Sequence, residues 1–312
     1  MDFFSHLIRP LLLVLALLVS ACGTGTDATS SATGSVSSDT TDGGNPASSI
    51  DPHKLPVGTP YVTTSTPAPG WLYVCATGNG PGASAMGPWF DADGKTWDPS
   101  LKIAVQGAIT WESNFTVEQG SALELNGNGL PAYPTGNFPI APSDPAHAYD
   151  RNPNRIRSVN IAWSLPAAPQ IATKPTCLNM GPIGVLLSGV RLFNAADEAG
   201  RDAVAWEIQD SCQGHPEQSG AYHHHSVSSC ISQKDQSGQH SPLVGYVADG
   251  FGLYGNQGEG GKALTDADLD NCHGHSHVIT VNGVTLEQYH YHQTQEFPYT
   301  VGCYEGTPAE IH

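Results

Sequence analysis

The chain has 312 residues and a formal net charge of −17, from 29 acidic and 12 basic side chains. This excess of negative charge argues against nucleic acid and against an anionic membrane surface as partners, because both would repel it. Glycine and proline are abundant, with 35 and 24 residues, and no long helical period is visible in the sequence.

The first 21 residues have the features of a leader rather than of a folded domain. Arg9 precedes an apolar run over residues 11–19, which is too short to cross a bilayer as a helix. The run ends in Val-Ser-Ala-Cys-Gly, which is typical of a bacterial lipobox. We expect residues 1–21 to be a lipoprotein signal peptide and Cys22 to carry the lipid, with an ordinary secretory signal as the alternative. The first interpretation predicts an exported, lipid-anchored protein at the outer membrane or cell surface.

A flexible tether is predicted to follow the leader, over residues 22–58. Most of this segment is Ser, Thr, Gly and Asp. Such a composition cannot bury enough apolar surface to offset the entropy lost on ordering. We assign residues 59–306 to the folded domain and residues 307–312 to a C-terminal tail.

The domain is predicted to be mainly β with a few short helices. Residues 103–110, 155–163 and 185–187 have the pattern of strands, the first two with partial alternation. Thr265 and Asp268 have the spacing of a helix N-cap and its third helical residue, which predicts one short helix.

Two parts of the chain are similar to each other. Residues 184–193 align with residues 245–254, and an Asp-x-Cys-x-Gly-His element at 210–215 recurs at 270–275. Each copy then reaches a histidine-rich stretch. The stretches are Tyr-His-His-His at 222–225 and Tyr-His-Tyr-His at 289–292.

These matches predict an internal duplication, with copies at about 183–233 and 243–304. We expect each copy to contain a strand, a glycine turn, a second strand, a loop and a histidine strand. The two copies would then pack about a pseudo-twofold axis and share one core.

Six cysteines besides Cys22 predict three disulfides, because an exported protein folds in an oxidising compartment. They are Cys75, Cys177, Cys212, Cys230, Cys272 and Cys303. The last four occupy matching positions in the two copies. Bridges within each copy would leave Cys75 to pair with Cys177, and bridges between the copies are the alternative.

Several motifs resemble those of a known family. They are Asp-Leu-Asp-Asn-Cys-His-Gly-His at 268–275, Tyr-His-Tyr-His at 289–292, Phe-Pro-Tyr-Thr-Val-Gly-Cys at 297–303, and Asn-Gly-Leu-Pro at 128–131. Together they resemble the YHYH domain family over about residues 120–306. The family has no established activity, so the resemblance implies a domain boundary rather than a reaction.

The chain departs from the family pattern at three positions. His224 stands in the first copy where the second has Tyr291. Gly252 stands where the family often has proline, and Tyr133 where it often has histidine.

The second histidine motif predicts a metal site. On a strand, His290 and His292 point to one face and the two tyrosines to the other. His275, just beyond the tight turn, is the best third ligand. We expect the nitrogens of these three histidines to converge to within roughly 3 to 3.5 Å, as ligand distances near 2.0–2.1 Å require.

The first copy offers the matching ligands His215, His223 and His225. Three neutral imidazoles suit Zn²⁺ or Cu²⁺ with a position open to water. Asp210 and Asp270 are candidate acceptors that would orient the ring nitrogens. An alternative is that both triads meet in one shared site.

Three further histidines, His224, His273 and His277, are candidates for spare ligands or surface residues.

Two functions therefore remain open. The first is an exported lipoprotein that binds a transition metal through its histidine clusters, with a metal-dependent enzyme of unknown substrate as a special case. The second is an extracellular interaction or adhesion module whose histidines and disulfides are structural. A metal-free enzyme with histidine as general base is also conceivable, but no motif nominates a nucleophile.

Overall fold

The structure is a computed structural model that describes residues 50–312 apart from residues 83 and 282. This part of the chain is mainly β, with one four-residue α-helix and five short 3-10 helices, which confirms the predicted fold class. It contains no helix that is long and apolar enough to cross a membrane. The predicted signal peptide, Cys22 and most of the tether lie outside the described residues.

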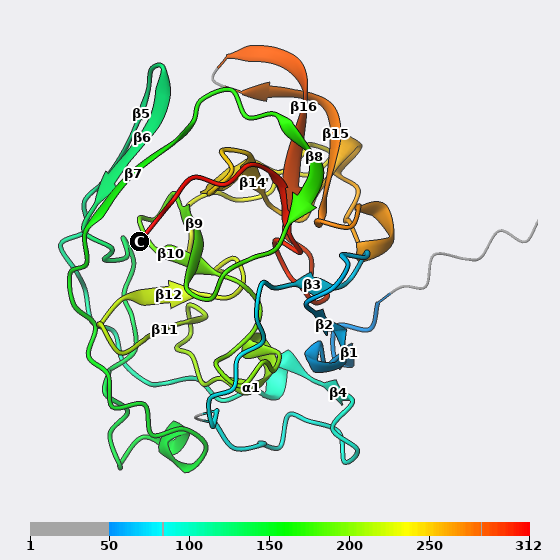
Figure 1. Cartoon of the computed structure of the whole chain (residues 1–312). Helices are drawn as coiled ribbons and strands as arrows, with labels where there is room; N and C mark the ends of the chain where they lie inside the picture. Colours follow the sequence, from blue (N-terminus) through cyan, green and yellow to red (C-terminus); the bar gives the residue numbers. More distant parts are fainter. Residues whose placement is uncertain (1–49, 83, 282) are drawn as a thin grey trace, which may run out of the picture. The chain divides into compact units, whose positions relative to one another are not determined.

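Eight strands form the central sheet (Figure 1). They are β9 (Pro182–Leu186), β10 (Arg191–Phe193), β11 (Gly214–Pro216), β12 (Tyr222–His224), β13 (Leu243–Val247), β14 (Gly252–Tyr254), β15 (Gly274–Val281) and β16 (Val284–His292). A second sheet has three strands, which are β5 (Phe115–Gln119), β6 (Ala122–Gly127) and β7 (Ile161–Pro166).

The remaining elements are short. Three two-stranded sheets pair β1 (Leu55–Pro56) with β4 (Thr96–Trp97), β2 (Val62–Thr63) with β3 (Leu72–Tyr73), and β8 (Ile171–Thr176) with β17 (Tyr304–Gly306). The helices are α1 (Ala203–Trp206) and the 3-10 turns η1 (Thr59–Tyr61), η2 (Pro99–Leu101), η3 (Pro145–Ala148), η4 (Glu259–Gly261) and η5 (Asp266–Asp268).

The two halves of the central sheet have the same topology. The strand order is β11-β12-β10-β9-β13-β14-β16-β15, so β9 and β13 meet in the middle as an antiparallel pair. In each half the inner strands form an antiparallel hairpin, the histidine strand lies parallel to its neighbour, and the outermost strand is antiparallel. The arrangement is the one expected for two equivalent units around a pseudo-twofold axis. That these units arose by duplication stays a prediction.

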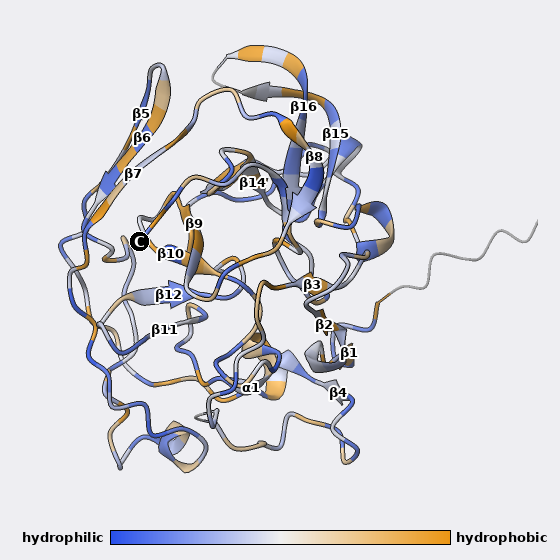
Figure 2. Ribbon diagram, in the orientation of Figure 1, coloured by the Kyte–Doolittle hydropathy of each residue, from blue (hydrophilic) through white to orange (hydrophobic). Residues whose placement is uncertain are grey.

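Alternating side chains attach the three-stranded sheet to the centre of the eight-stranded one. In β7, Ile161, Trp163 and Leu165 are buried and the residues between them are exposed. They form a small apolar cluster with Val185 of β9 and Tyr246 of β13, which pair with each other across the middle of the large sheet. Figure 2 shows β9 as one of the most hydrophobic strands. The other face of the large sheet contributes to the main core.

The local predictions had mixed outcomes. The capping box at Thr265 and Asp268 is confirmed, since both reciprocal hydrogen bonds form at η5. The strand predicted at 103–110 is wrong: this segment makes isolated bridges at Val105 and Ile109, because it lies against loops rather than beside a continuous strand. Of residues 155–163, the part from Ile161 onward is a strand, and residues 185–187 overlap the end of β9.

Packed residues extend past both predicted domain boundaries. Leu55 and Val57, assigned to the tether, belong to the main core. At the other end, Ile311 packs against both apolar clusters, and the main-chain oxygen of His312 accepts hydrogen bonds from Trp163 and Arg191. The folded part therefore includes residues on either side of 59–306.

The structure forms three disulfides. Cys212–Cys230 and Cys272–Cys303 each close a loop within one copy, and Cys75–Cys177 joins segments 102 residues apart. This is the pairing predicted for bridges within the copies, and bridges between the copies are excluded.

A buried carboxyl, Asp249, links the second histidine strand to the C-terminal strand. It accepts hydrogen bonds from the Tyr291 hydroxyl and from the backbone amides of Gly306 and Phe251. The side chain is 1% exposed, and burial raises its pKa from 3.8 to about 6 despite these donors. A carboxyl with a raised folded-state pKa binds its proton more tightly in the folded than in the unfolded chain.

The stability that this proton contributes is present below pH 4 and is lost as the pH rises through about 6. We therefore predict that Asp249→Asn becomes more stable relative to the natural protein, by about 2 kcal/mol, between pH 4 and pH 7. Urea unfolding at both pH values measures this difference, and Glu310→Gln, which changes an exposed carboxylate, serves as the control. A difference that stays constant with pH would contradict the role assigned to Asp249.

Candidate metal stations

Each Asp-x-Cys-x-Gly-His element folds into a tight turn around its aspartate. In the second copy, Asp270 accepts hydrogen bonds from the backbone amides of Cys272 (2.9 Å) and Gly274 (3.1 Å). It also accepts one from the hydroxyl of Tyr289 on β16 (3.1 Å). The turn is therefore fastened to the histidine strand by a tyrosine of that strand.

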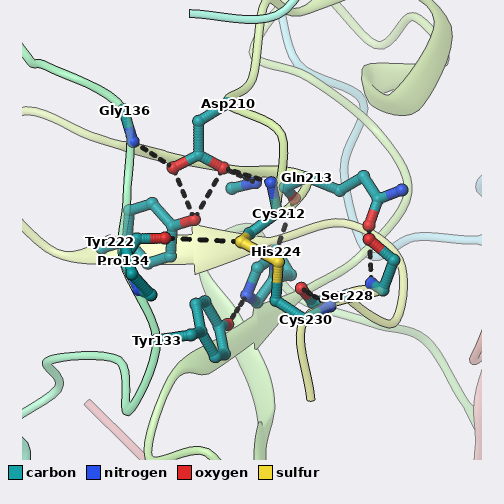
Figure 3. The surroundings of a disulfide bond; sticks show 12 residues. Tyr133, Pro134, Gly136, Asp210, Cys212, Gln213, Tyr222, His224, Ser228 and Cys230 are labelled. Carbon is teal, nitrogen blue, oxygen red and sulfur yellow. Dashed lines mark hydrogen bonds between the residues drawn. A yellow bond between two sulfur atoms is a disulfide. The ribbon is translucent and has the colours of Figure 1, made fainter. Parts of the chain in front are cut away.

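The first copy repeats this arrangement (Figure 3). Asp210 accepts from the amides of Cys212 (2.9 Å) and Gly214 (3.3 Å) and from the hydroxyl of Tyr222 (2.9 Å). A further donor, the amide of Gly136, comes from the segment before β7. Cys212, in the middle of the same turn, forms a disulfide with Cys230.

The tyrosine side chain leaves no room for a Cβ atom at the glycine of each Asp-x-Cys-x-Gly-His element. A Cβ atom at Gly214 would lie 2.3 Å from the ring of Tyr222, and one at Gly274 would lie 2.4 Å from the hydroxyl of Tyr289. Any side chain at these positions would push the tyrosine away from the aspartate. The Asp, Gly and Tyr of the repeated motif thus form one structural unit.

This geometry corrects the role predicted for the two aspartates. Their hydrogen-bond donors are backbone amides and tyrosine hydroxyls, not histidine ring nitrogens. Asp210 and Asp270 therefore position the turn that carries the next histidine, rather than orienting the imidazoles.

The two-residue period of β16 separates tyrosines from histidines as predicted. Tyr289 and Tyr291 lie in the main core. His290 and His292 are fully buried on the opposite face. The cross-strand partner of His290 is His275, which brings the predicted third ligand beside the pair.

The second station has five histidines. They are His240, His275, His277, His290 and His292, and one ring nitrogen from each lies within 4.8 Å of all the others. The three predicted ligands are among them. The separation of roughly 3 to 3.5 Å expected between ligands of one ion falls within this limit.

The first station joins the three histidines predicted for it, His215, His223 and His225, again within 4.8 Å. His215 is the cross-strand partner of His223, and the Nε2 atoms of His223 and His225 are 3.2 Å apart. The two stations are separate groups, which excludes the single shared site. They belong to opposite halves of the central sheet.

Backbone carbonyls fix the tautomer of most station histidines. In the first station, Nδ1 of His223 and of His225 bonds to the carbonyls of Ala221 (3.2 Å) and Asn194 (2.5 Å). A carbonyl can only accept, so Nδ1 carries the proton and Nε2 presents a lone pair. Two such lone pairs facing each other at 3.2 Å repel unless a cation or a proton lies between them.

Bonds from Nδ1 to backbone carbonyls also fix tautomers in the second station. The Nδ1 atoms of His290 and His292 bond to the carbonyls of Gln288 (3.0 Å) and Gly255 (2.6 Å). The Nδ1 atoms of His240 and His277 each bond to the backbone carbonyl of the next residue in the sequence. The Nε2 atoms of His240 and His290 are 3.2 Å apart. Within the described residues, Nε2 of His275, His277 and His292 is buried without a hydrogen-bond partner.

Two other histidines show what a structural histidine looks like in this fold. Both ring nitrogens of His273 are hydrogen-bonded, to backbone carbonyls on one side and to Asp266 and Thr294 on the other. His224 bonds to the carbonyl of Gln213 and to the hydroxyl of Tyr133. Both side chains are buried, so the prediction of spare ligands or surface residues is wrong for them. His277 does join its station.

The contact between His224 and Tyr133 joins two of the departures from the family pattern. Figure 3 shows the hydroxyl of Tyr133 directed at the imidazole of His224. The pair lies on the tyrosine side of the strand, away from the first station.

Burial favours the neutral form of several station imidazoles, and His225, described below, is an exception. It lowers the pKa of His290 to about 3, of His292 to about 2 and of His275 to about 4, with neighbouring histidines adding to the effect. In the first station, burial lowers the pKa of His223 well below its usual range. Neutral imidazole is the form that binds metal ions.

A carboxylate, Glu207, also reaches the first station. Its Oε2 atom lies 3.2 Å from Nε2 of His215 and 3.0 Å from Nε2 of His225. Burial opposes its charge, but the two histidines outweigh burial and hold the pKa of Glu207 well below its usual range. The pKa of His225 is raised in turn, because Glu207 outweighs the effect of burial.

Sequence reasoning missed Glu207 and His240. Glu207 follows α1, and His240 lies in the segment between the two copies, so neither belongs to the repeated pattern. His240 has no counterpart in the repeat, so its position in the sequence does not indicate a metal ligand. Glu207 could have been suspected only as an acidic residue three positions before Asp210.

The comparisons with known proteins agree with the sequence motifs in part. The profile of a family described as YHYH protein matches residues 162–267. No curated protein and no solved structure matches the chain. The match confirms the predicted resemblance over a narrower range than residues 120–306 and ends before the second histidine motif. The chain therefore contains YHYH-family sequence at residues 162–267, which enclose the whole first station.

Proposed function

We propose that the protein binds transition-metal ions at its two histidine stations. One observation carries the proposal. Buried histidines from separate segments turn Nε2 atoms toward a common point while backbone carbonyls hold their Nδ1 protons. Burying an acceptor without a partner costs about 1–3 kcal/mol, so repeated unpartnered nitrogens favour a ligand between them.

An interaction or adhesion module would need the same histidines only for structure. His273 and His224 argue against that reading, because both of their ring nitrogens are satisfied by the protein itself. Six of the eight station histidines instead have Nδ1 bonded to a backbone carbonyl and Nε2 directed inward, and the other two, His215 and His275, have no such carbonyl bond within the described part of the chain. Structure alone does not require this difference.

Zn²⁺ and Cu²⁺ are the ions that the donor set supports best. Neutral imidazole is a borderline ligand that suits both, and neither station includes a thiolate or thioether. When bound, such an ion would supply Lewis-acid chemistry.

The first station is the place for any metal-dependent chemistry. A cavity of about 350 Å³ is lined by its three histidines and by Glu207, within the size range of small-molecule sites. By contrast, the hollows beside the second station are each lined by one of its histidines, His240 or His290. We name no substrate, because the cavity walls are acidic and polar without a motif for a particular group.

We further propose that the protein is exported and anchored by a lipid on Cys22. The Val-Ser-Ala-Cys-Gly sequence supports the anchor. Three disulfides support an oxidising compartment outside the cytoplasm. The protein would then hold its metal at the outer membrane or cell surface.

Zinc binding measured on tag-free protein tests the metal function. We expect two equivalents of Zn²⁺ by calorimetry, one for each station. His225→Ala and His292→Ala should each lose one equivalent, and the double variant should bind none. His53→Ala removes an exposed histidine and should keep both. Zinc binding that is absent, or unchanged in the double variant, would refute the proposal.

Bound metal should also stabilise the fold, because ions that bind the folded chain shift the unfolding equilibrium. Each station should add about 2.7 kcal/mol to the free energy of unfolding at a free Zn²⁺ concentration of 100 times its Kd. Urea titrations with and without Zn²⁺ measure the gain. Loss of one station should halve it, whereas an equal gain in the double variant would point to nonspecific binding.

The lipid anchor is tested at its one cysteine. Cys22→Ala should remove incorporation of labelled palmitate and release the protein from the detergent phase of a Triton X-114 partition. Continued membrane partition of this variant would favour a different mode of attachment.

A further inference from the structure

The two stations differ in charge. The first offers three imidazoles together with the carboxylate of Glu207, whose Oε2 is 3.0 and 3.2 Å from two of them. The second offers five imidazoles, and the carboxylate of Glu259 beside it is 3.6 Å from Nδ1 of His277 and 72% exposed. Buried anionic oxygen is thus a feature of the first station.

The hydrogen-bond geometry around Glu207 fits a metal ligand. Its Oε2 atom is buried, and among the described residues it accepts no hydrogen bond of proper direction, although two imidazole nitrogens are near. Both nitrogens of His215 are also without a partner. Oxygen and nitrogens therefore converge on the space between them rather than bonding to one another.

The backbone holds Glu207 in place. It follows α1 directly, and its amide bonds to the carbonyl of Ala203. The N-cap of α1, Asp202, is buried and accepts hydrogen bonds from the amides of Gly58 and Ala205 and from the hydroxyl of Tyr299. The helix, and with it Glu207, is tied to both ends of the folded chain.

The second copy has no counterpart to this carboxylate. At the 60-residue offset of the neighbouring Asp-x-Cys-x-Gly-His element, the position of Glu207 corresponds to Ala267. The next residue, Asp268, is acidic, but its side chain bonds to Lys262 and to the backbone amide and hydroxyl of Thr265, in the capping box of η5. This acidic group therefore caps a helix and does not reach the second station.

We propose that the two stations differ in metal preference, and that Glu207 extends the first station to Mn²⁺, an ion that the second rejects. The proposal rests on the metal binding proposed above. Mn²⁺ is the weakest-binding of the common first-row divalent ions and prefers oxygen ligands, whereas Zn²⁺ and Cu²⁺ bind well to imidazole alone. A fixed carboxylate in a buried site supplies both the oxygen and a compensating charge.

Acidic side chains around the first station should assist the approach of a cation. Asp150, Glu198 and Glu217 line the cavity that borders it. Their effect is on the local cation concentration, and they are distinct from Glu207 because they lie outside the histidine cluster.

Electron paramagnetic resonance of Mn²⁺ tests the difference in tag-free protein. His292→Ala retains only the first station and should bind one equivalent of Mn²⁺. His225→Ala retains only the second and should leave Mn²⁺ free at the same concentration. Equal Mn²⁺ affinity in the two variants, or none in His292→Ala, would overturn the proposal.

The role of Glu207 is tested in the same assay. Glu207→Gln should weaken Mn²⁺ binding at least about tenfold while Zn²⁺ still binds at the three imidazoles. Retained Zn²⁺ binding shows that the variant is folded. Glu198→Gln removes one exposed negative charge from the same cavity and should have a small effect. Equal losses in the two variants would assign the preference to general charge and overturn the role of Glu207.

The zinc result separates the two proposals. If Zn²⁺ fills both stations and Mn²⁺ does not distinguish them, the metal preference is wrong and metal binding stands. If Zn²⁺ fills neither, the metal function itself fails.

Discussion

The alternation of side chains along the two histidine strands is the constraint on which the site depends. In β16 a tyrosine faces the core and the next residue, a histidine, faces the station. The tyrosine hydroxyl reaches the aspartate of the preceding turn, and that turn delivers another histidine to the same station. Adjacent residues of one strand therefore stabilise the fold and place the ligands. In the first copy the hydroxyl of Tyr222 makes the corresponding hydrogen bond to Asp210.

A second constraint acts on the imidazoles. Hydrogen bonds from Nδ1 to backbone carbonyls select one tautomer, and they use carbonyls at matching positions in the two halves, such as Asn194 and Gly255. The lone pairs on Nε2 are then forced together in buried space. An arrangement that leaves several acceptors facing one another is unfavourable for the metal-free chain and favourable for a chain that holds a cation. The stations are in this sense preorganised.

Much of this could be predicted because it is periodic. Matching offsets predicted the equivalent strands and the within-copy disulfides, and the two-residue strand period predicted the faces of His290 and His292. The residues that sequence reasoning missed come from irregular segments. Glu207 and His240 reach their stations through tertiary packing of a helix end and a loop, which no spacing encodes. Asp210 and Asp270 bond to the amides of their own turns rather than to imidazoles, and the spacing of residues does not reveal this preference.

Anomalous diffraction from crystals of the zinc-loaded protein is the most direct measurement of whether the inward-facing nitrogens are ligands. The account predicts two peaks at the zinc edge, one bounded by Nε2 of His223 and His225 and the other by Nε2 of His290 and His292. Nδ1 of each of these histidines should keep its backbone carbonyl. Zinc found only on exposed side chains, with the buried Nε2 atoms bonded to protein groups instead, would contradict it.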